Sequence, residues 1–228
     1  MDGPHLIYFS DPMCSWCYGF SPVVASIRAA FGRGLPIRLV MGGLRPGTET
    51  VMTDAAKADL RGHWTHVSDA TGLPFAEDAM AWPGFRYDTD PAARAVVAVR
   101  RIDPELALTY LHSTQRAFYA EGRDVTDLQV LCDLACEHGL DREAFETVLA
   151  GEDLKEETWR DYAVSQRAGV TGFPTLVAGA GDGSPFGVVT RGYNSGEQVL
   201  AALHNWVEGS VAGVASTVTV PPAPAPKG

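Results

Sequence analysis

The feature that most constrains the fold is a pair of cysteines, Cys14 and Cys17, that follows directly after a short apolar segment. Residues 5–9 form a β-prone run that closes at a Ser-Asp-Pro turn, and residues 17–31 carry apolar side chains at helical spacing. A second β-prone run, residues 35–41, comes after a Gly-Arg-Gly stop. A crossover of this length makes the two strands parallel neighbours with a right-handed connection. The sequence therefore places the cysteine pair at a strand-to-helix junction inside a βαβ unit.

The middle of the chain, from about Thr53 to Gly169, changes to one helical pattern after another without a convincing strand. Thr126 and Gln129 fit a capping box at the start of one of these helices, and Gly139 fits its stop. The predicted helices in this region are 92–101, 105–119, 126–139, 141–150 and 153–168. We expect residues 53–169 to form an all-helical insertion.

Strand character returns after the insertion. Residues 174–178 and 187–191 are β-prone and are joined by a glycine-rich turn, which predicts an antiparallel hairpin. Ser195 and Gln198 form a capping-box pattern before a helix at 197–208. The order βαβ, helices, then ββα predicts a single sheet. The segment 210–228 ends in a Pro- and Ala-rich stretch, and we expect it to be a disordered tail.

Composition restricts the class of protein and its surroundings. The 228 residues carry a formal net charge of −10, which argues against nucleic acid as a partner because such binding needs clustered Lys and Arg. The first residues lack a basic, signal-like region, and no stretch approaches the length of a membrane span. We therefore expect a cytoplasmic α/β protein that does not bind membranes. Four cysteines are too few for a disulfide-stapled secreted scaffold.

The spacing of the cysteine pair points to redox chemistry. If the helix starts at or just before Cys14, the free N–H groups of its first turn favour the thiolate, which is the nucleophilic form. Cys17 lies three residues on, on the same face, close enough to form a disulfide with Cys14. The prediction is that Cys14 attacks and Cys17 resolves. A reduced pair packed in the core, or half of a metal site, are the alternatives.

The other cysteines and the histidines give weaker signals. Cys132 and Cys136 belong to an apolar helical face that ordinarily packs inward, so a regulatory second dithiol is the less favoured interpretation. A structural zinc site made from all four cysteines is a further alternative. His63 and His66 have a spacing compatible with a metal on a helix, but no third ligand completes the site, and we interpret them as surface or packing residues. No metal site is predicted.

Six aromatic residues could line an apolar surface near the dithiol, for unfolded chains or a small aromatic molecule. Of these, Phe20 has helical neighbours and is expected in the core, whereas Trp16, between the cysteines, is expected to be exposed. The six are Trp16, Tyr18, Phe20, Trp64, Trp82 and Phe173.

Two motifs carry a resemblance to a known family. The stretch Phe9-Ser10-Asp11-Pro12-Met13-Cys14-Ser15-Trp16-Cys17, together with Gly172-Phe173-Pro174-Thr175, resembles the DsbA-like branch of the thioredoxin superfamily, and within it the FrnE-like proteins. The resemblance covers about residues 4–209 and implies a thioredoxin fold with a large helical insertion. The thioredoxin-like domain would then be discontinuous, formed by residues 1–52 and 170–209, with 53–169 inserted.

The resemblance also implies roles for individual residues. In such proteins the proline at the position of Pro174 is typically cis and faces the dithiol, and Phe173 would offer its backbone to an extended substrate strand. Trp16 and Thr175 complete the expected substrate-binding set. From the residues alone, Pro174 equally permits a trans proline that opens a strand.

These inferences lead to a thiol–disulfide oxidoreductase of the DsbA family, acting through a mixed disulfide of Cys14. No cofactor is expected beyond the redox-active Cys14–Cys17 disulfide, with glutathione possible as a co-substrate and protein or small thiols as substrates. The alternative is a glutathione-dependent transferase or isomerase on the same scaffold, although those relatives tend to keep one serine or cysteine where this chain has two. The sequence leaves the direction of electron flow and the oligomeric state open.

Overall fold

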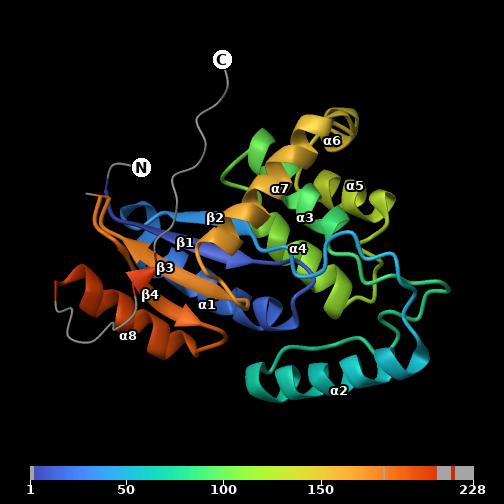
Figure 1. The fold of residues 1–228 in the computed structure, drawn as a ribbon, viewed down its shortest axis with the longest axis horizontal. Coiled ribbons are helices and arrows are strands. Elements are labelled where there is room, and N and C mark those ends of the chain that lie inside the picture. The colour runs from blue at the N-terminus through green and yellow to red at the C-terminus, as the bar shows by residue number, and fades with distance from the viewer. Residues whose placement is uncertain (1–2, 182, 210–216, 219–228) are drawn as a thin grey trace.

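The computed structural model describes residues 3–181, 183–209 and 217–218. Within these residues five strands form one mixed sheet in the order β2-β1-β3-β4-β5 (Figure 1). β1 pairs parallel with β2 and antiparallel with β3, and β3 and β4 form the predicted antiparallel hairpin. The strands are β1 (His5–Ser10), β2 (Ile37–Met41), β3 (Thr175–Gly179), β4 (Phe186–Arg191) and β5 (Thr217–Val218).

Eight α-helices and one 3-10 turn are found among the described residues. They are α1 (Ser15–Phe31), η1 (Gly32–Gly34), α2 (Asp54–Thr71), α3 (Asp90–Ile102), α4 (Ala107–Tyr119), α5 (Leu128–Glu137), α6 (Arg142–Leu149), α7 (Glu152–Arg167) and α8 (Gly196–Val207). The predicted α/β class, the single sheet and the long helical insertion are confirmed. In Figure 1, α3 to α7 gather on one side of the molecule, while α2 lies apart from them along the lower edge.

Local capping fixes several helix starts. Ser195 and Gln198 form the predicted capping box of α8. The predicted capping box at Thr126 is wrong, because Asp127 is the N-cap residue of α5 and its side chain accepts the hydrogen bond from the backbone N–H of Gln129. Asp and Thr are both good N-cap residues, so two adjacent candidates cannot be separated by pattern alone.

The sheet is covered on both faces because successive side chains of β1 point in opposite directions. Leu6 and Tyr8 pack into the main hydrophobic cluster, which continues without a break into the helices α3, α4 and α5. Ile7 and Phe9 pack on the other face, against apolar residues of α7 such as Val164. One continuous core therefore joins the sheet to the inserted helices.

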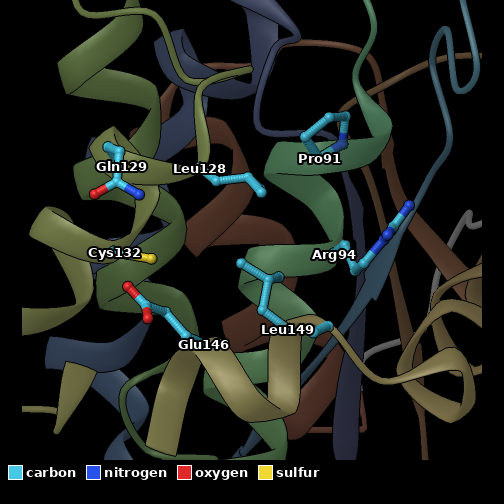
Figure 2. A pocket seen from close by; sticks show the side chains of 8 residues that line it. Pro91, Arg94, Leu128, Gln129, Cys132, Glu146 and Leu149 are labelled. Carbon is cyan, nitrogen blue, oxygen red and sulfur yellow. The ribbon is translucent and has the colours of Figure 1, made fainter. Parts of the chain in front are cut away.

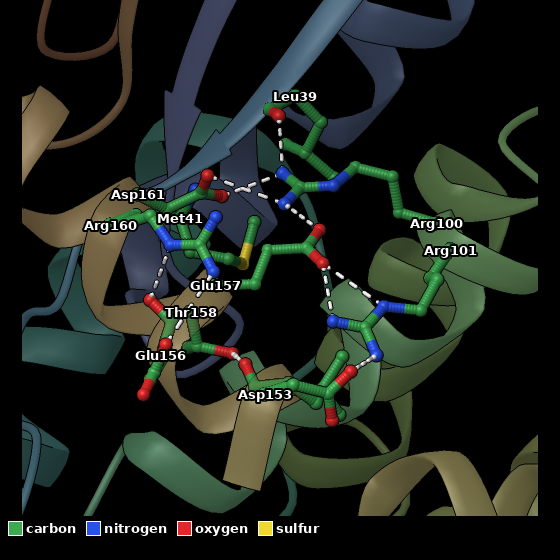
Figure 3. A network of polar contacts seen from close by, with 11 residues as sticks. Leu39, Met41, Arg100, Arg101, Asp153, Glu156, Glu157, Thr158, Arg160 and Asp161 are labelled. Carbon is green, nitrogen blue, oxygen red and sulfur yellow. Dashed lines mark hydrogen bonds and ion pairs between the residues drawn. The ribbon is translucent and has the colours of Figure 1, made fainter. Parts of the chain in front are cut away.

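A network of charges ties the insertion to β2, the edge strand of the sheet (Figure 3). Arg100 of α3 donates to the backbone carbonyl of Leu39 at 2.9 Å and to Asp161 of α7 at 2.6 Å. Asp161 in turn accepts the backbone N–H of Met41 at 2.9 Å. These side chains satisfy backbone groups that an edge strand would otherwise leave unpaired.

The division of the chain into domains 1–52 with 170–209, and 53–169, stays a prediction. The expected disordered tail, residues 210–228, lies outside the described residues except for Thr217–Val218, which pair with β4 as β5. None of the helices within the described ranges has the length and apolar character needed to cross a membrane.

Candidate active site

Cys14 stands at the start of α1, as its N-cap residue. Its backbone N–H donates to the carbonyl of Asp11 at 3.2 Å, and its own carbonyl accepts from the N–H of Tyr18 at 3.0 Å. The Cys14 thiol donates to the carbonyl of Phe173 at 3.6 Å, and the residue is 8% exposed. The sulfur therefore sits where the unpaired N–H groups of a first helical turn favour negative charge.

Cys17 lies behind Cys14 in the first turn of α1 and is fully buried. Both cysteines are free thiols. Burial raises the pKa of the Cys17 thiol well above its usual value, and a hydrogen bond to Cys14 raises it further, while the hydroxyl of Ser10 acts in the opposite direction. A thiol held in this state is protonated at neutral pH and needs help to ionise.

The Phe173–Pro174 segment faces Cys14, and its peptide bond is cis. The Phe173 ring packs on Gly42, directly after β2, so closely that a Cβ added to Gly42 would lie 2.2 Å from ring carbons. Thr175 is buried, and its hydroxyl donates to the carbonyl of Gly172 at 2.8 Å. The structure thus brings Phe173 and Pro174 to the dithiol, whereas the side chain of Thr175 is turned inward and its backbone pairs with Phe9 of β1 and Arg191 of β4.

A cavity of about 370 Å³ opens beside Cys14. Its walls come from the start of α1, the segment after β2, α2, the segment before α3, and Phe173. The lining residues are Met13, Cys14, Ser15, Trp16, Leu44, Arg45, Leu60, His63, Tyr87 and Phe173. Cys14, although mostly covered, is thus reachable through a pocket of small-molecule size.

Trp16 is half-buried and stands between α2 and the segment that precedes α8. Its ring centroid lies 6.1 Å from that of His63, 5.7 Å from that of His66 and 5.5 Å from that of Tyr193. Both histidines therefore pack against Trp16, and His63 also lines the cavity. Of the other aromatic candidates, Phe20, Tyr18 and Trp64 are buried.

The sequence reasoning missed Asp11, which is fully buried three residues before Cys14. Its carboxylate accepts the backbone N–H groups of Met13 at 2.9 Å and Leu44 at 2.8 Å, and so joins the dithiol loop to the segment after β2. Burial raises the pKa of Asp11 to about 6, although these two hydrogen bonds lower it in part. The available signal was a charged residue directly after a short, mostly apolar β-prone segment.

Tyr87 was also missed. Its hydroxyl donates to the carbonyl of Met13 at 2.6 Å and lies 3.1 Å from the hydroxyl of Tyr119. The Arg45 guanidinium stacks on the Tyr87 ring at 5.2 Å. No local pattern marks Tyr87, because it reaches the dithiol loop from 74 residues away in the chain.

Cys132 and Cys136 lie elsewhere, on α5. Cys132 lines a separate cavity of about 390 Å³ between α3, α5 and α6, where Figure 2 shows its sulfur beside Glu146 and Leu149. Burial raises the pKa of Cys132 to about 11, and the Glu146 carboxylate adds to the effect. A thiol of this kind stays protonated and is a poor nucleophile, in agreement with its interpretation as a packing residue.

Across the described ranges, no three His, Cys, Asp or Glu side chains are grouped so that they could hold a metal ion. The alternative of a zinc site built from all four cysteines therefore gains no geometric support.

The fold and the site together define a class of protein: a thioredoxin-like sheet with a Cys-x-x-Cys at the start of its first helix, opposite a cis-proline. The family model of the DSBA-like thioredoxin domain matches residues 5–203, and the chain belongs to this family of disulfide oxidoreductases. The resemblance inferred from the two motifs is thereby confirmed at the level of the DsbA-like family. The FrnE-like subgroup stays a prediction.

Several solved structures are similar. A structure from Nitrosomonas europaea, described as a candidate protein disulfide isomerase, is 35% identical with a TM-score of 0.83, covering 91% of this chain and 98% of that one. The cytosolic disulfide reductase DsbM from Pseudomonas aeruginosa is 28% identical with a TM-score of 0.74, covering 90% and 98%. DsbM has also been solved with GSH.

Among curated proteins, the ClpXP adapter protein SpxH of Bacillus subtilis is 24% identical over an alignment of 174 residues, and the match covers 74% of this chain. The chain spans only 56% of that relative's length.

Proposed function

We propose that this protein is a thiol–disulfide oxidoreductase in which Cys14 is the nucleophile and Cys17 the resolving thiol. The observation that carries the proposal is the position of the Cys14 sulfur at the helix N-cap, on the wall of a cavity and 3.6 Å from the Phe173 carbonyl. Cys17, fully buried one turn behind, is protected from direct attack by substrate. The family membership supports the same chemistry.

The reaction runs in two exchanges. The Cys14 thiolate attacks one sulfur of a substrate disulfide, which forms a Cys14–substrate disulfide and releases the other substrate sulfur as a thiolate that takes up a proton. Cys17 then loses its proton and attacks Cys14, which forms the Cys14–Cys17 disulfide and releases the second substrate sulfur as a thiol. The substrate gains two electrons and two protons, and the protein dithiol loses them. The reverse sequence oxidises a dithiol.

The walls of the cavity support two kinds of substrate. The backbone of Phe173 lies directly before β3 and on the wall of the cavity, where an extended segment of a protein substrate can pair with it. The cavity itself, with Arg45 and His63 in its wall, suits a small anionic thiol such as glutathione. The similar reductase DsbM has been solved with GSH, which favours a small anionic thiol as the co-substrate of this protein. A cytoplasmic location and reducing direction are part of the same proposal.

The second cysteine separates this proposal from the glutathione-dependent transferase or isomerase. A transferase needs one thiol or hydroxyl to activate glutathione, and it has no use for a buried partner that removes a bound thiol. The 2-hydroxychromene-2-carboxylate isomerase that shares the fold is only 16% identical, so it indicates the fold alone.

Insulin reduction by dithiothreitol, followed as turbidity, tests the proposal. We expect Cys14→Ser to abolish catalysis. Cys17→Ser should instead trap mixed disulfides that a mass spectrometer detects, because the resolving thiol is missing. Cys132→Ser is the matched control and should retain wild-type activity, since its thiol is buried in a separate cavity. A Cys14→Ser protein as active as the wild type would refute the assignment of the nucleophile.

A further inference from the structure

The surroundings of Cys17 raise a question that the two-thiol scheme leaves unanswered. Cys17 is fully buried, and two hydroxyl-bearing residues at the end of β1, Tyr8 and Ser10, lie beside it and are buried with it. Ser10 belongs to the stretch that carries the family resemblance and Tyr8 precedes it, but the two-thiol scheme gives neither residue a role.

The Ser10 hydroxyl is a buried, unsatisfied polar group. It is buried, and no hydrogen-bond partner is found for its oxygen within the described part of the chain. Leaving a buried hydroxyl unpaired costs about 1–3 kcal/mol. The backbone cannot shift to relieve this, because the Ser10 carbonyl accepts from the N–H of Gly42 at 2.7 Å and the residue is held in register opposite Met41 of β2.

We propose that the Ser10 hydroxyl is a further catalytic group, which donates a hydrogen bond to the Cys17 sulfur when that sulfur becomes a thiolate. The inference rests on the proposed function, since it assigns a role in the resolving exchange. It explains why a hydroxyl is kept without a partner next to a buried thiol: the partner exists only during the reaction.

The electrostatics around the sulfur agree with this geometry. The pKa of Cys17 is raised by burial and by Cys14, whereas the Ser10 hydroxyl and the backbone N–H of Asp11 both act to lower it. The nearby titratable groups are Tyr8, whose own pKa is raised well above its usual value by burial, and Cys14. Tyr8 is therefore neutral at pH 7 and brings no competing charge to the sulfur.

A donor that acts only on the thiolate accelerates the reaction. In the resting protein Cys17 carries its proton and the Ser10 hydroxyl makes no hydrogen bond of good geometry within the described residues, so it stabilises the resting thiol only a little. For the resolving exchange Cys17 has to lose its proton, and the hydroxyl donates to the thiolate that forms, which raises the fraction of Cys17 able to attack. The Cys17 proton ends on the departing substrate thiolate. The Cys14–substrate bond breaks as the Cys14–Cys17 bond forms.

Reaction of the reduced protein with an aromatic disulfide that releases a coloured thiol separates the two exchanges. The first equivalent of colour reports attack by Cys14, and the second reports resolution by Cys17. We expect Ser10→Ala to leave the first phase unchanged and to slow the second about tenfold. In a Cys14→Ser background, alkylation across a pH range should give a Cys17 pKa about one pH unit higher when Ser10→Ala is added.

Stability distinguishes this role from a structural one. Because Ser10→Ala removes a buried hydroxyl that has no partner, it should leave the free energy of unfolding unchanged or raise it. Ser165→Ala, at a buried serine of α7, is the matched control and should change neither phase. Equal slowing of both phases, an unaltered second phase, or an unaltered Cys17 pKa would overturn the inference. Absence of the second phase in the wild type would instead refute the proposed resolving role of Cys17.

Discussion

At the scale of single residues, Asp11 is the most unusual group near the dithiol, because its carboxyl is fully buried and, within the described part of the chain, is held by backbone N–H groups rather than by a salt bridge. Its pKa of about 6 in the folded protein lies above the value of 3.8 expected when it is unfolded. The folded state therefore binds the Asp11 proton more tightly. This contribution favours folding at low pH and is lost as the pH rises toward and through about 6.

The variant Asp11→Asn tests whether Asp11 makes the folded protein less stable as the pH rises. The wild type should lose about 1.5 kcal/mol of stability between about pH 5 and pH 7.5 from this one group, and the amide variant should not, because it cannot ionise. Urea unfolding at the two pH values measures the difference. Asp59→Asn, at an exposed position of α2, is the control and should keep the wild-type dependence. If the stability of Asp11→Asn depended on pH as that of the wild type does, Asp11 would not be the group that titrates between these two pH values.

At the scale of elements, the site depends on the close contact of two chain segments that meet at Cys14. The end of β2 carries Gly42, and the segment before β3 carries Phe173, whose ring occupies the space where a side chain on Gly42 would lie. The Phe173 carbonyl accepts from the Cys14 thiol, so the position of the ring controls the geometry of the dithiol.

Gly42→Ala should therefore impair activity more than the addition of a single methyl group suggests. The added methyl would lie 2.2 Å from the Phe173 ring, which has to move and take its carbonyl with it. We expect at least a tenfold loss of insulin reduction and about 1–3 kcal/mol of destabilisation from overpacking. Combining Gly42→Ala with Phe173→Ala should restore the stability but not the activity. Gly34→Ala, where a Cβ meets open space, is the control.

The sequence predicted those elements whose signals are local. The βαβ unit around Cys14 was visible because apolar periodicity, a turn and a glycine stop follow one another in the chain, and the start of α8 was visible because its cap lies within four residues. The neighbours that shape the site were not visible. Asp11, Arg45 and Tyr87 act through contacts between distant segments, and no spacing rule encodes such contacts. The cis state of Pro174 could be expected only from the family resemblance, since a trans proline fits the same residues.

At the scale of the whole molecule, the insertion and the sheet behave as one unit because charged groups of α3 and α7 join at β2. Arg100 binds Asp161 and the Leu39 carbonyl, and Arg101 binds Glu157 at 2.7 Å and Asp153 at 2.7 Å. Burial alone would raise the pKa of Glu157, but hydrogen bonds from Arg101 and Arg100 hold it below its usual value. A carboxyl with a lowered pKa stabilises the folded state above its unfolded pKa and stops doing so as the pH falls through the folded value.

Arg100→Met should therefore weaken the molecule as a whole rather than the dithiol alone. It leaves Asp161 mostly buried without its cation and the edge of β2 without a donor, and breaking a buried pair in this way costs about 3–5 kcal/mol. Arg123→Met, which removes an exposed pair with Glu137 at 3.2 Å, should cost under about 1 kcal/mol. Denaturant midpoints at pH 7 compare the two. On acidification below about pH 4.5 the wild type should lose stability more steeply than Arg100→Met. Protonation of Glu157 removes the stabilisation that its ion pairs provide, and the variant already lacks the pair with Arg100. Equal midpoints for the two variants at pH 7 would mean that the continuous apolar core alone holds the insertion to the sheet.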